Sequence, residues 1–402
     1  MKKLTLLLIV ICVVFISSCQ LSRADRLVQN EAVYSDKVYA AWLGKFIGLI
    51  AGQPTEGWGR ELIEQKARAI DFYPITGYMP ENFDSPHTNF LLGNFEGSPP
   101  NDDTDLMLTS LIALRQHGTD LTAQDIAETW LKYVPNACTA ERVALHNFQN
   151  DIWPPQSASI DNPYQEMIGA QMRADIWGMI APGIPVLAAD YAYRDASISH
   201  TGNGIYGAQF IAALVSSAMV ESDINKIIQT ALKTIPYDCA YAEAVRDAVA
   251  WHNKYVAWQS AWEQLDKKWG FLKNGKRDDI FTDEKYISNK EFYMWNDTKW
   301  VYADVNGAAV AMALLYGEGD FTKSVCLAVM IGYDNDCNAG TVGAVLGAIN
   351  GTQAIDESWK VPLLDTYHTT LNQSEKQIKI SDIALETAKY GLKVVKTSSA
   401  RR

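Results

Sequence analysis

The stretch Gly332-Tyr-Asp-Asn-Asp-Cys-Asn-Ala-Gly-Thr-Val-Gly-Ala-Val-Leu-Gly-Ala-Ile-Asn-Gly351 joins two acidic residues to a glycine-striped apolar helix. Its glycines recur at spacings of three and four, at Gly340, Gly343, Gly347 and Gly351. Residues at these spacings share one face of a helix. Each helical glycine costs about 0.5–1 kcal/mol relative to alanine. The stripe therefore predicts close approach of a second helix, with Asp334 and Asp336 forming a metal site at the helix entrance.

A second glycine-striped segment lies near the start of the chain and ends close to an acidic residue. Its glycines fall four apart, at Gly44, Gly48 and Gly52. Pro54 marks the end of this helix, because proline disrupts a helix interior. Glu56 follows two residues later. We therefore expect Glu56 just beyond a closely packed helix.

A second acidic cluster, Asn101-Asp-Asp-Thr-Asp105, stands before an apolar periodic run. A single carboxylate in that position is typical of a helix N-cap. Asp102 and Asp103 are adjacent, however, and a cap needs only one of them. Together with Asp334 and Asp336, they place four carboxylates at the N-terminal ends of two expected helices. Such oxygen ligands favour Mg²⁺, Mn²⁺ or Ca²⁺ over zinc. The chain contains neither an HExxH motif nor a GxxxxGK[ST] phosphate loop.

Helical periodicity or helix-forming composition extends over most of the chain. The segments expected to be helical are 35–52, 103–117, 123–133, 204–219, 223–234, 240–269, 306–316 and 341–349. Alternating β-branched runs bounded by hairpin turns are scarce, so the sequence predicts an all-α fold in a single large domain. Two long aromatic segments, 73–100 and 281–302, are expected to be functional loops rather than disordered ones.

The first 18 residues have the pattern of a secretory signal rather than of a folded segment. They begin with two lysines, continue with an apolar core and lead to Ile16-Ser-Ser-Cys19. The last residue resembles the cysteine of a bacterial lipobox. This interpretation predicts lipidation at Cys19, a tether over 19–34, a folded domain over 35–395 and a lipid-anchored protein of the cell envelope, on the periplasmic or surface side of the outer membrane. The alternative is an ordinary secreted protein in which this cysteine has no role.

The net charge is −12 at neutral pH, and removing a signal that contains Lys2 and Lys3 makes it −14. Such an acidic chain disfavours nucleic acid and an anionic membrane surface as partners. A neutral or metal-bridged small molecule or glycan fits better, and we expect a monomer that meets the membrane only through its lipid. The cysteines beyond the signal are widely spaced, without a CxxC pair to indicate a disulfide: Cys138, Cys239, Cys326 and Cys337.

Several segments resemble, in order and separation, those of the ADP-ribosylglycohydrolase superfamily, and the likeness spans nearly the whole chain after the signal. The three signatures are 48–56, 101–104 and 332–344, and 169–178, 182–185 and 199–207 are similar to the family's central segment. The resemblance implies an all-α, orthogonally packed bundle that holds two divalent ions, usually magnesium, at the bottom of a cleft. It also implies hydrolysis of N- or O-glycosidic bonds to ribose in ADP-ribose conjugates.

The resemblance also assigns roles to particular residues. Those on the family's metal-ligand positions are Asn101, Asp102, Asp103, Asp334, Asp336 and Cys337. Glu56 falls on the acidic position that serves catalysis or gates the cleft, and Asp336 could share the proton transfer. Three positions depart from the family pattern, with Asn101 for a hydroxyl residue, Cys337 for threonine and Leu49 for aspartate. A thiol is a poor ligand for a hard cation, so Cys337 is either a ligand or a small buried residue.

Further polar residues are candidates for substrate contact: Arg173, Asp175, His200 and Asn306. Structural alternatives exist for them. Arg173 and Asp175 could form an ion pair between helices, and the histidine could bond loop carbonyls. Aromatic residues of the second long loop, Trp295, Trp300 and Tyr302, could stack on a sugar or base or pack in the core.

These features predict a metal-dependent glycoside hydrolase. Furanoside cleavage passes through an oxocarbenium-like state and needs leaving-group assistance and an activated water. Paired divalent ions could supply the activated water, and Glu56 or a metal-site aspartate could transfer the proton. The signal and the altered Asn101, Leu49 and Cys337 favour a pentofuranosyl or related, ribofuranosyl-like sugar in an extracytoplasmic glycan or conjugate. The alternatives are a true ADP-ribosyl-protein hydrolase, a catalytically inactive glycan-binding descendant and, more weakly, a metal-dependent phosphodiesterase.

Overall fold

The computed structural model describes residues 22–270, 284–289, 292–293 and 298–401. Across these ranges the regular secondary structure is helical apart from one antiparallel pair of short strands, β1 (Thr366–His368) and β2 (Gln377–Lys379). In the same part of the chain, every helix is too short or too polar to cross a membrane. The predicted all-α fold is confirmed. The predicted signal and the lipidation site at Cys19 lie outside the described residues.

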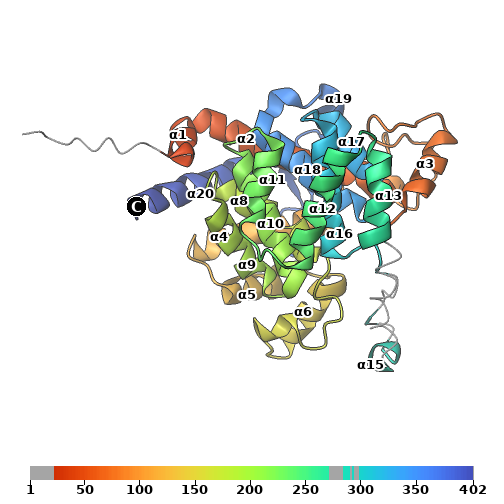
Figure 1. The fold of residues 1–402 in the computed structure, drawn as a ribbon. Helices are drawn as coiled ribbons and strands as arrows, with labels where there is room; N and C mark the ends of the chain where they lie inside the picture. The colour runs from red at the N-terminus through yellow and green to blue at the C-terminus, as the bar shows by residue number, and fades with distance from the viewer. Residues whose placement is uncertain (1–21, 271–283, 290–291, 294–297, 402) are drawn as a thin grey trace, which may run out of the picture.

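The helices cross one another in several directions, and α20 leads out to the C terminus at the left of Figure 1. The α-helices are α1 (Arg23–Gln29), α2 (Glu31–Gly52), α3 (Arg60–Arg68), α4 (Asp102–His117), α5 (Ala123–Tyr133), α6 (Thr139–Gln149), α7 (Gly169–Met172), α8 (Asp175–Ile180), α9 (Pro185–Ala196), α10 (Gly202–Ala218), α11 (Ile224–Leu232), α12 (Ala240–Lys254), α13 (Trp258–Trp269), α15 (Glu284–Ile287), α16 (Ala303–Gly317), α17 (Phe321–Ile331), α18 (Asn335–Asn350), α19 (Glu357–Lys360) and α20 (Ile380–Ala400). The short 3-10 helices are η1 (Gln53–Thr55), η2 (Thr88–Phe90), η3 (Gln156–Ala158), η5 (Thr352–Ala354) and η6 (Val361–Leu363).

Helices α2 and α18 form the centre of the fold, and they pack backbone against backbone through the two glycine stripes. A Cβ atom added at Gly48 would lie 2.1 Å from the Ala339 carbonyl oxygen, and one added at Gly343 would lie 2.1 Å from the Gly44 carbonyl oxygen. No side chain fits at such distances. The close approach predicted from the glycine spacing is therefore present, and its partner is the other glycine-striped helix.

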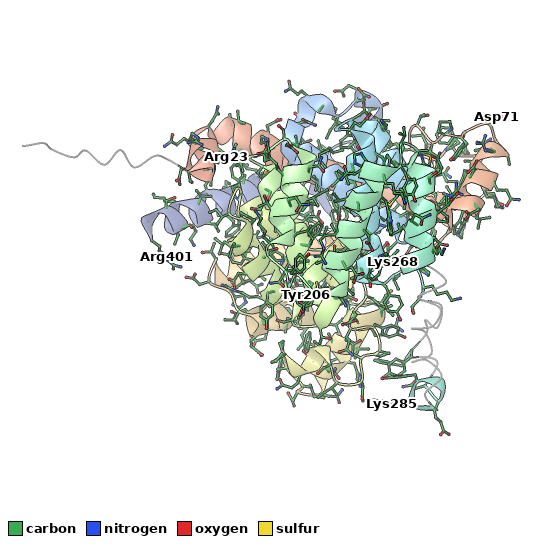
Figure 2. The ribbon with its side chains drawn as sticks, in the orientation of Figure 1. Arg23, Asp71, Tyr206, Lys268, Lys285 and Arg401 are labelled. Atoms are coloured by element: carbon green, nitrogen blue, oxygen red, sulfur yellow. The ribbon has the colours of Figure 1, made fainter. Side chains whose placement is uncertain are left out.

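Further helices enclose this pair on several sides. Helix α17 packs along α18, and α16 contacts both α17 and α18. Helix α20 packs against α2, where the Trp42 indole N–H donates to Thr387 Oγ1 at 3.1 Å. Helix α10 lies against α7, α8 and α9. Figure 2 shows side chains filling the space between helices, with Asp71, Lys285 and Arg401 at the margins of the molecule. The entrances of α4 and α18 are thereby held inside the protein.

The segment predicted as a tether, 19–34, is helical where it is described. A capping box between Ser22 and Asp25 begins α1, and α2 starts at Glu31. Tyr34 is fully buried, and its hydroxyl donates to the Met179 carbonyl oxygen at 2.7 Å. Residues 23–34 therefore pack as part of the domain. Apolar periodicity missed them because only a few of their side chains face the core.

Several helix boundaries differ from the expected ones. The segment 240–269 breaks at Tyr255, whose backbone is extended and whose carbonyl accepts a hydrogen bond from the Tyr316 hydroxyl at 2.7 Å. Helix α18 begins at Asn335 rather than near residue 341, so Asp336 lies in its first turn. Helix α16 begins at Ala303. The loop 73–100 contains only the short η2.

Candidate active site

The two acidic clusters meet because the N-termini of α4 and α18 face one another. Asn101 caps α4, and its side-chain oxygen accepts the Asp103 backbone N–H at 2.9 Å. Its amide nitrogen donates to Asp336 Oδ2 at 3.3 Å and to Gln53 Oε1 at 2.7 Å. Helix N-termini favour negative charge, so both entrances can carry carboxylates. Residues more than two hundred positions apart thus form one acid cluster.

One end of this cluster consists of Glu56, Asp334 and Asp336. One carboxylate oxygen from each residue lies within 4.8 Å of the others. Asp334 Oδ1 and Asp336 Oδ1 are buried, and neither has a hydrogen-bond partner among the described residues. Unpaired buried carboxylate oxygens are costly. Their convergence fits a hard divalent cation such as Mg²⁺, which takes oxygen ligands.

The cluster also shifts its own protonation. Burial, with Asp336 and Asp102 nearby, raises the pKa of Glu56 well above its usual value. Burial, followed by Asp336 and Glu56, does the same to the pKa of Asp334. Burial also raises the pKa of Asp103 to about 6, although Lys45 opposes it. Without a cation, therefore, the cluster binds protons more tightly than isolated carboxylates do.

The other end of the cluster consists of Asp103, Asp336 and Cys337, which also bring one ligand atom each within 4.8 Å. A buried lysine reaches into this end. Lys45 Nζ lies 2.9 Å from Asp103 Oδ2 and 3.2 Å from Asp175 Oδ2. Burial lowers the pKa of Lys45, but the two carboxylates outweigh it and the net shift is upward. This lysine was missed in the sequence, where the signal was a lone charge inside the apolar run 38–52.

Most of the acid cluster lines a cavity of about 600 Å³. Every residue on the expected metal positions except Asp103 lines it, and so does Glu56. Asp102 opens onto the cavity, where desolvation, with Asp103 beside it, raises its pKa to about 6. The apolar wall includes Leu106, Met167, Ile168, Met172, Trp300, Val301 and Leu371. The described lining includes no lysine or arginine.

Several lining residues were not predicted. Gln53 Nε2 donates to Glu56 Oε2, and His87 Nε2 lies 3.7 Å from that same oxygen. Glu141 also lines the cavity, and burial raises its pKa to about 7 while Arg173 opposes the shift. His87 belongs to the aromatic loop 73–100, which was expected to be functional. Single polar residues in loops and helices carry no pattern by which the sequence could have identified them.

The residues expected to contact substrate lie behind the cavity wall. Arg173, Asp175, His200 and Asn306 are all buried, and none of them lines the cavity. Asp175 pairs with Lys45, and His200 Nδ1 lies 2.9 Å from Ser199 Oγ. Burial and then Arg173 lower the pKa of His200 well below its usual value. Their direct contact with substrate has no support in this geometry.

Asn306 has a positioning role in the structure. Its side-chain oxygen accepts the Asp334 backbone N–H at 3.2 Å and an amide N–H of Asn338 at 2.7 Å. Its amide group donates to the carbonyl oxygens of Trp300 and Tyr302. Asn306 thereby connects the entrance of α18 to the segment that carries Trp300. Of the aromatic candidates, Trp300 lines the cavity, Tyr302 is buried and Trp295 lies outside the described residues.

Comparison with protein-family models matches residues 30–389 to the ADP-ribosylglycohydrolase family. The chain belongs to the ADP-ribosylglycohydrolase family. Among solved structures, the chain is similar to one described as an ADP-ribosylglycohydrolase-related protein complex, with a TM-score of 0.53 and 19% identity over 90% of this chain and 98% of that one. That likeness supports the fold. The search of curated proteins found no match. The family is one of hydrolases, and the acid cluster supplies groups able to bind the metal on which such enzymes typically depend.

Proposed function

We propose that this protein is a metal-dependent glycoside hydrolase that cleaves an N- or O-glycosidic bond to a ribofuranosyl-like sugar, in an extracytoplasmic glycan or conjugate. The observation that carries the proposal is the convergence of Glu56, Asp334 and Asp336 on the cavity, with two buried carboxylate oxygens that have no hydrogen-bond partner among the described residues.

The donor set fits a divalent cation, for which Mg²⁺ is the first choice and Mn²⁺ or Ca²⁺ the alternatives. Glu56, Asp334 and Asp336 would hold it, with Asp102 and Asn101 beside them. Such an ion, when bound, supplies positive charge that binds sugar hydroxyls and lowers the pKa of water. Asp334 is held in place for this task by Asn306.

Glu56 is the residue best placed to move a proton. Its Oε2 accepts a hydrogen bond from Gln53, which is held in turn by Asn101. Because the Glu56 carboxylate lies beside those of Asp334 and Asp336, an ionised Glu56 next to a bound cation could accept the proton of an attacking water. The carboxylates around it also place negative charge where an oxocarbenium-like state develops positive charge.

The cavity lining supports a neutral or cationic substrate. Its lining includes the acidic residues Glu56, Asp102, Glu141, Asp334 and Asp336, while the described lining lacks lysine and arginine. A pyrophosphate group would therefore meet repulsion rather than a binding site. Trp300 offers an aromatic face beside Gly57, whose φ of +74° and missing side chain leave room for the indole ring. Aromatic faces of this kind stack well on sugar rings.

A true ADP-ribosyl-protein hydrolase is the second candidate, because the family match favours it. A catalytically inactive glycan-binding descendant fits less well, since the unpaired buried carboxylates would then remain without a ligand.

A substrate panel tests the proposal. Purified protein is assayed on chromogenic pentofuranosides and on ADP-ribosyl-arginine and ADP-ribosyl-serine, each with magnesium and with EDTA. We expect hydrolysis of at least one furanoside that needs the metal and is lost in Glu56→Gln. A kcat/KM for an ADP-ribosyl conjugate well above that for every furanoside would reject the proposed substrate class. Activity that persists in EDTA would reject metal dependence.

The proposed location is tested separately. We propose that Cys19 is acylated and anchors the protein to the cell envelope, as the lipobox-like Ile16-Ser-Ser-Cys19 indicates. Mass spectrometry of membrane fractions should find the acylated N-terminus in the wild type and a soluble protein for Cys19→Ser. A soluble, unmodified wild-type protein would reject the anchor and leave the proposed chemistry intact.

A further inference from the structure

The two ends of the acid cluster differ in what already neutralises them. We infer that this chain holds one divalent cation, at Glu56, Asp334 and Asp336, and that the ammonium group of Lys45 replaces a second cation at the end formed by Asp103 and Cys337. The inference rests on the proposed metal dependence and concerns the number of ions. It departs from the two ions that the family resemblance implies.

Lys45 is anchored by one hydrogen bond and two ion pairs. Its ammonium group has three N–H donors. One donates to the Met172 carbonyl oxygen at 2.6 Å, and the others face Asp103 Oδ2 at 2.9 Å and Asp175 Oδ2 at 3.2 Å. The side chain is completely buried. A fully buried ammonium with one hydrogen bond and two ion pairs is a fixed part of the site rather than a mobile surface charge.

The packing of α2 against α18 prevents Lys45 from moving aside. A Cβ atom at Gly340 would lie 3.1 Å from Lys45 Cδ, so the lysine stem runs directly along the surface of α18. The two helix backbones are too close together for the stem to pass between them. The ammonium is therefore fixed opposite the first turns of α4 and α18.

Both oxygens of Asp103 are already occupied by groups of this chain. Lys45 faces Oδ2, and the Cys337 thiol donates to Oδ1 at 3.2 Å. The same sulfur lies 3.8 Å from the Met172 sulfur, so this end of the cluster is partly lined by soft atoms. Hard cations prefer oxygen ligands. A second divalent ion here would lose ligands and meet the positive charge of Lys45.

The opposite end has neither feature. Asp334 and Asp336 make no ion pair with a lysine or arginine in the described part of the chain, and Oδ1 of each has neither a hydrogen bond nor a paired cation. Asp103 Oδ2 also lacks a hydrogen bond, but the Lys45 ammonium lies 2.9 Å from it. Three carboxylates without a counter-charge favour one divalent ion. The acid cluster thus divides into a set that lacks a cation and a set whose cation is built into the chain.

Counting manganese tests the inference without relying on activity. The full-length protein is equilibrated with Mn²⁺, freed of unbound ion by gel filtration, and examined by elemental analysis and electron paramagnetic resonance. We expect one Mn²⁺ per chain, with the six-line spectrum of an isolated ion. Two ions per chain with a spin-coupled spectrum would overturn the inference and leave the proposed function standing. No bound manganese would overturn both the inference and the metal dependence.

Three variants test which groups are responsible. Asp334→Asn changes only the group formed by Glu56, Asp334 and Asp336, and this variant should lose most Mn²⁺ binding. Retained binding would overturn the assignment of the ion to that group. Lys45→Met should admit a second ion, and a folded variant that still binds one would overturn the role of Lys45. Cys337→Thr keeps the lysine and should still bind one ion. If Cys337→Thr binds two, the thiol rather than the lysine excludes the second ion, and this arm decides the question even if Lys45→Met does not fold.

Discussion

Two buried groups of charged residues border the same cavity, and they are built in opposite ways. Around Arg173, five N–H groups meet five acceptors: Glu141 Oε1, Asp195 Oδ1, Ser199 Oγ and the carbonyl oxygens of Gly169 and Asp195. In the acid cluster, carboxylates outnumber cations, and oxygens of Asp334 and Asp336 have no partner among the described residues. The first group is complete within the chain. The second leaves carboxylate oxygens that a cation could bind.

The comparison separates a structural role from a functional one where the sequence could not. Both groups contain buried charges in motifs of the same family. Only the balance of donors and acceptors separates the two groups. Every N–H group of Arg173 has an acceptor, so this residue joins α7 to α6 and α9, whereas one carboxylate oxygen of Asp336 has no hydrogen-bond partner among the described residues. The predictions below exploit that difference.

The largest expected effect on stability comes from Arg173→Met. Removing the guanidinium leaves Glu141 and Asp195 buried without their counter-charge, and breaking a buried pair in this way costs roughly 3–5 kcal/mol. Chemical denaturation near pH 8 measures it. The loss should be the same with magnesium and with EDTA. A loss that magnesium restores would place Arg173 in the metal site instead. Arg173→Lys has three N–H donors in place of five, so its free energy of unfolding should lie between those of the wild type and Arg173→Met.

The next effect is the loss of metal-linked stabilisation in Asp336→Asn. Ligand at about one hundred times its dissociation constant stabilises a protein by about 2.7 kcal/mol. The variant should lose most of this gain while its metal-free form is at least as stable as the metal-free wild type, because one repelling charge is gone. Asp195→Asn is the matched control and should be less stable under both conditions. Equal destabilisation of Asp336→Asn with and without metal would contradict the comparison.

A smaller effect concerns pH in the absence of metal. The pKa of Asp103 is about 6 in the fold and near 3.8 when unperturbed, so the folded state keeps its proton to higher pH than the unfolded state does. The stability due to this proton is complete below about pH 4 and is lost as pH rises through about 6. Thermal unfolding in EDTA should therefore show a falling midpoint across that range.

Magnesium should flatten that decline by binding the ionised carboxylates. Glu141, whose pKa burial raises to about 7, adds a decline at higher pH that magnesium should leave unchanged. A metal-free midpoint that rises steadily from pH 4 to pH 7 would contradict the assigned shifts of both groups.

The smallest effect is expected for Asn306→Ala. Its amide positions Asp334 without binding the ion itself, so the variant should lose about 1 kcal/mol of stability and bind magnesium more weakly, while any activity recovers at high metal concentration. Isothermal titration and kinetics at two metal concentrations measure this. Activity lost at saturating metal would show that Asn306 contacts the substrate.

The sequence predicted the features that follow from spacing along one helix. Glycines three and four apart in 44–52 and 340–347 predicted close helix packing, and acidic residues at two helix entrances predicted the cluster. The tether over 19–34 was misjudged, since 23–34 is helical and Tyr34 is buried. A few side chains that reach across the fold leave no periodic signal in a short segment.

The sequence could not predict in the same way which polar residues outside the two acidic clusters face the cavity. Arg173 and Asp336 both lie in motifs that resemble those of the family. Only the fold shows that Asp336 lines the cavity and that Arg173 is buried outside its lining. Lys45, His87 and Glu141 lie in or beside the acid cluster and its cavity because segments far apart in the sequence pack together. Spacing in the sequence carries no information about those contacts.

The most direct test of the central claim is the thermal unfolding of the wild-type protein at neutral pH, in EDTA and at increasing magnesium or manganese concentrations. The unpaired carboxylates of Asp334 and Asp336 predict a midpoint that rises with metal concentration and saturates. A midpoint that is the same in EDTA and at saturating metal would contradict the claim that the acid cluster is built to hold a divalent cation.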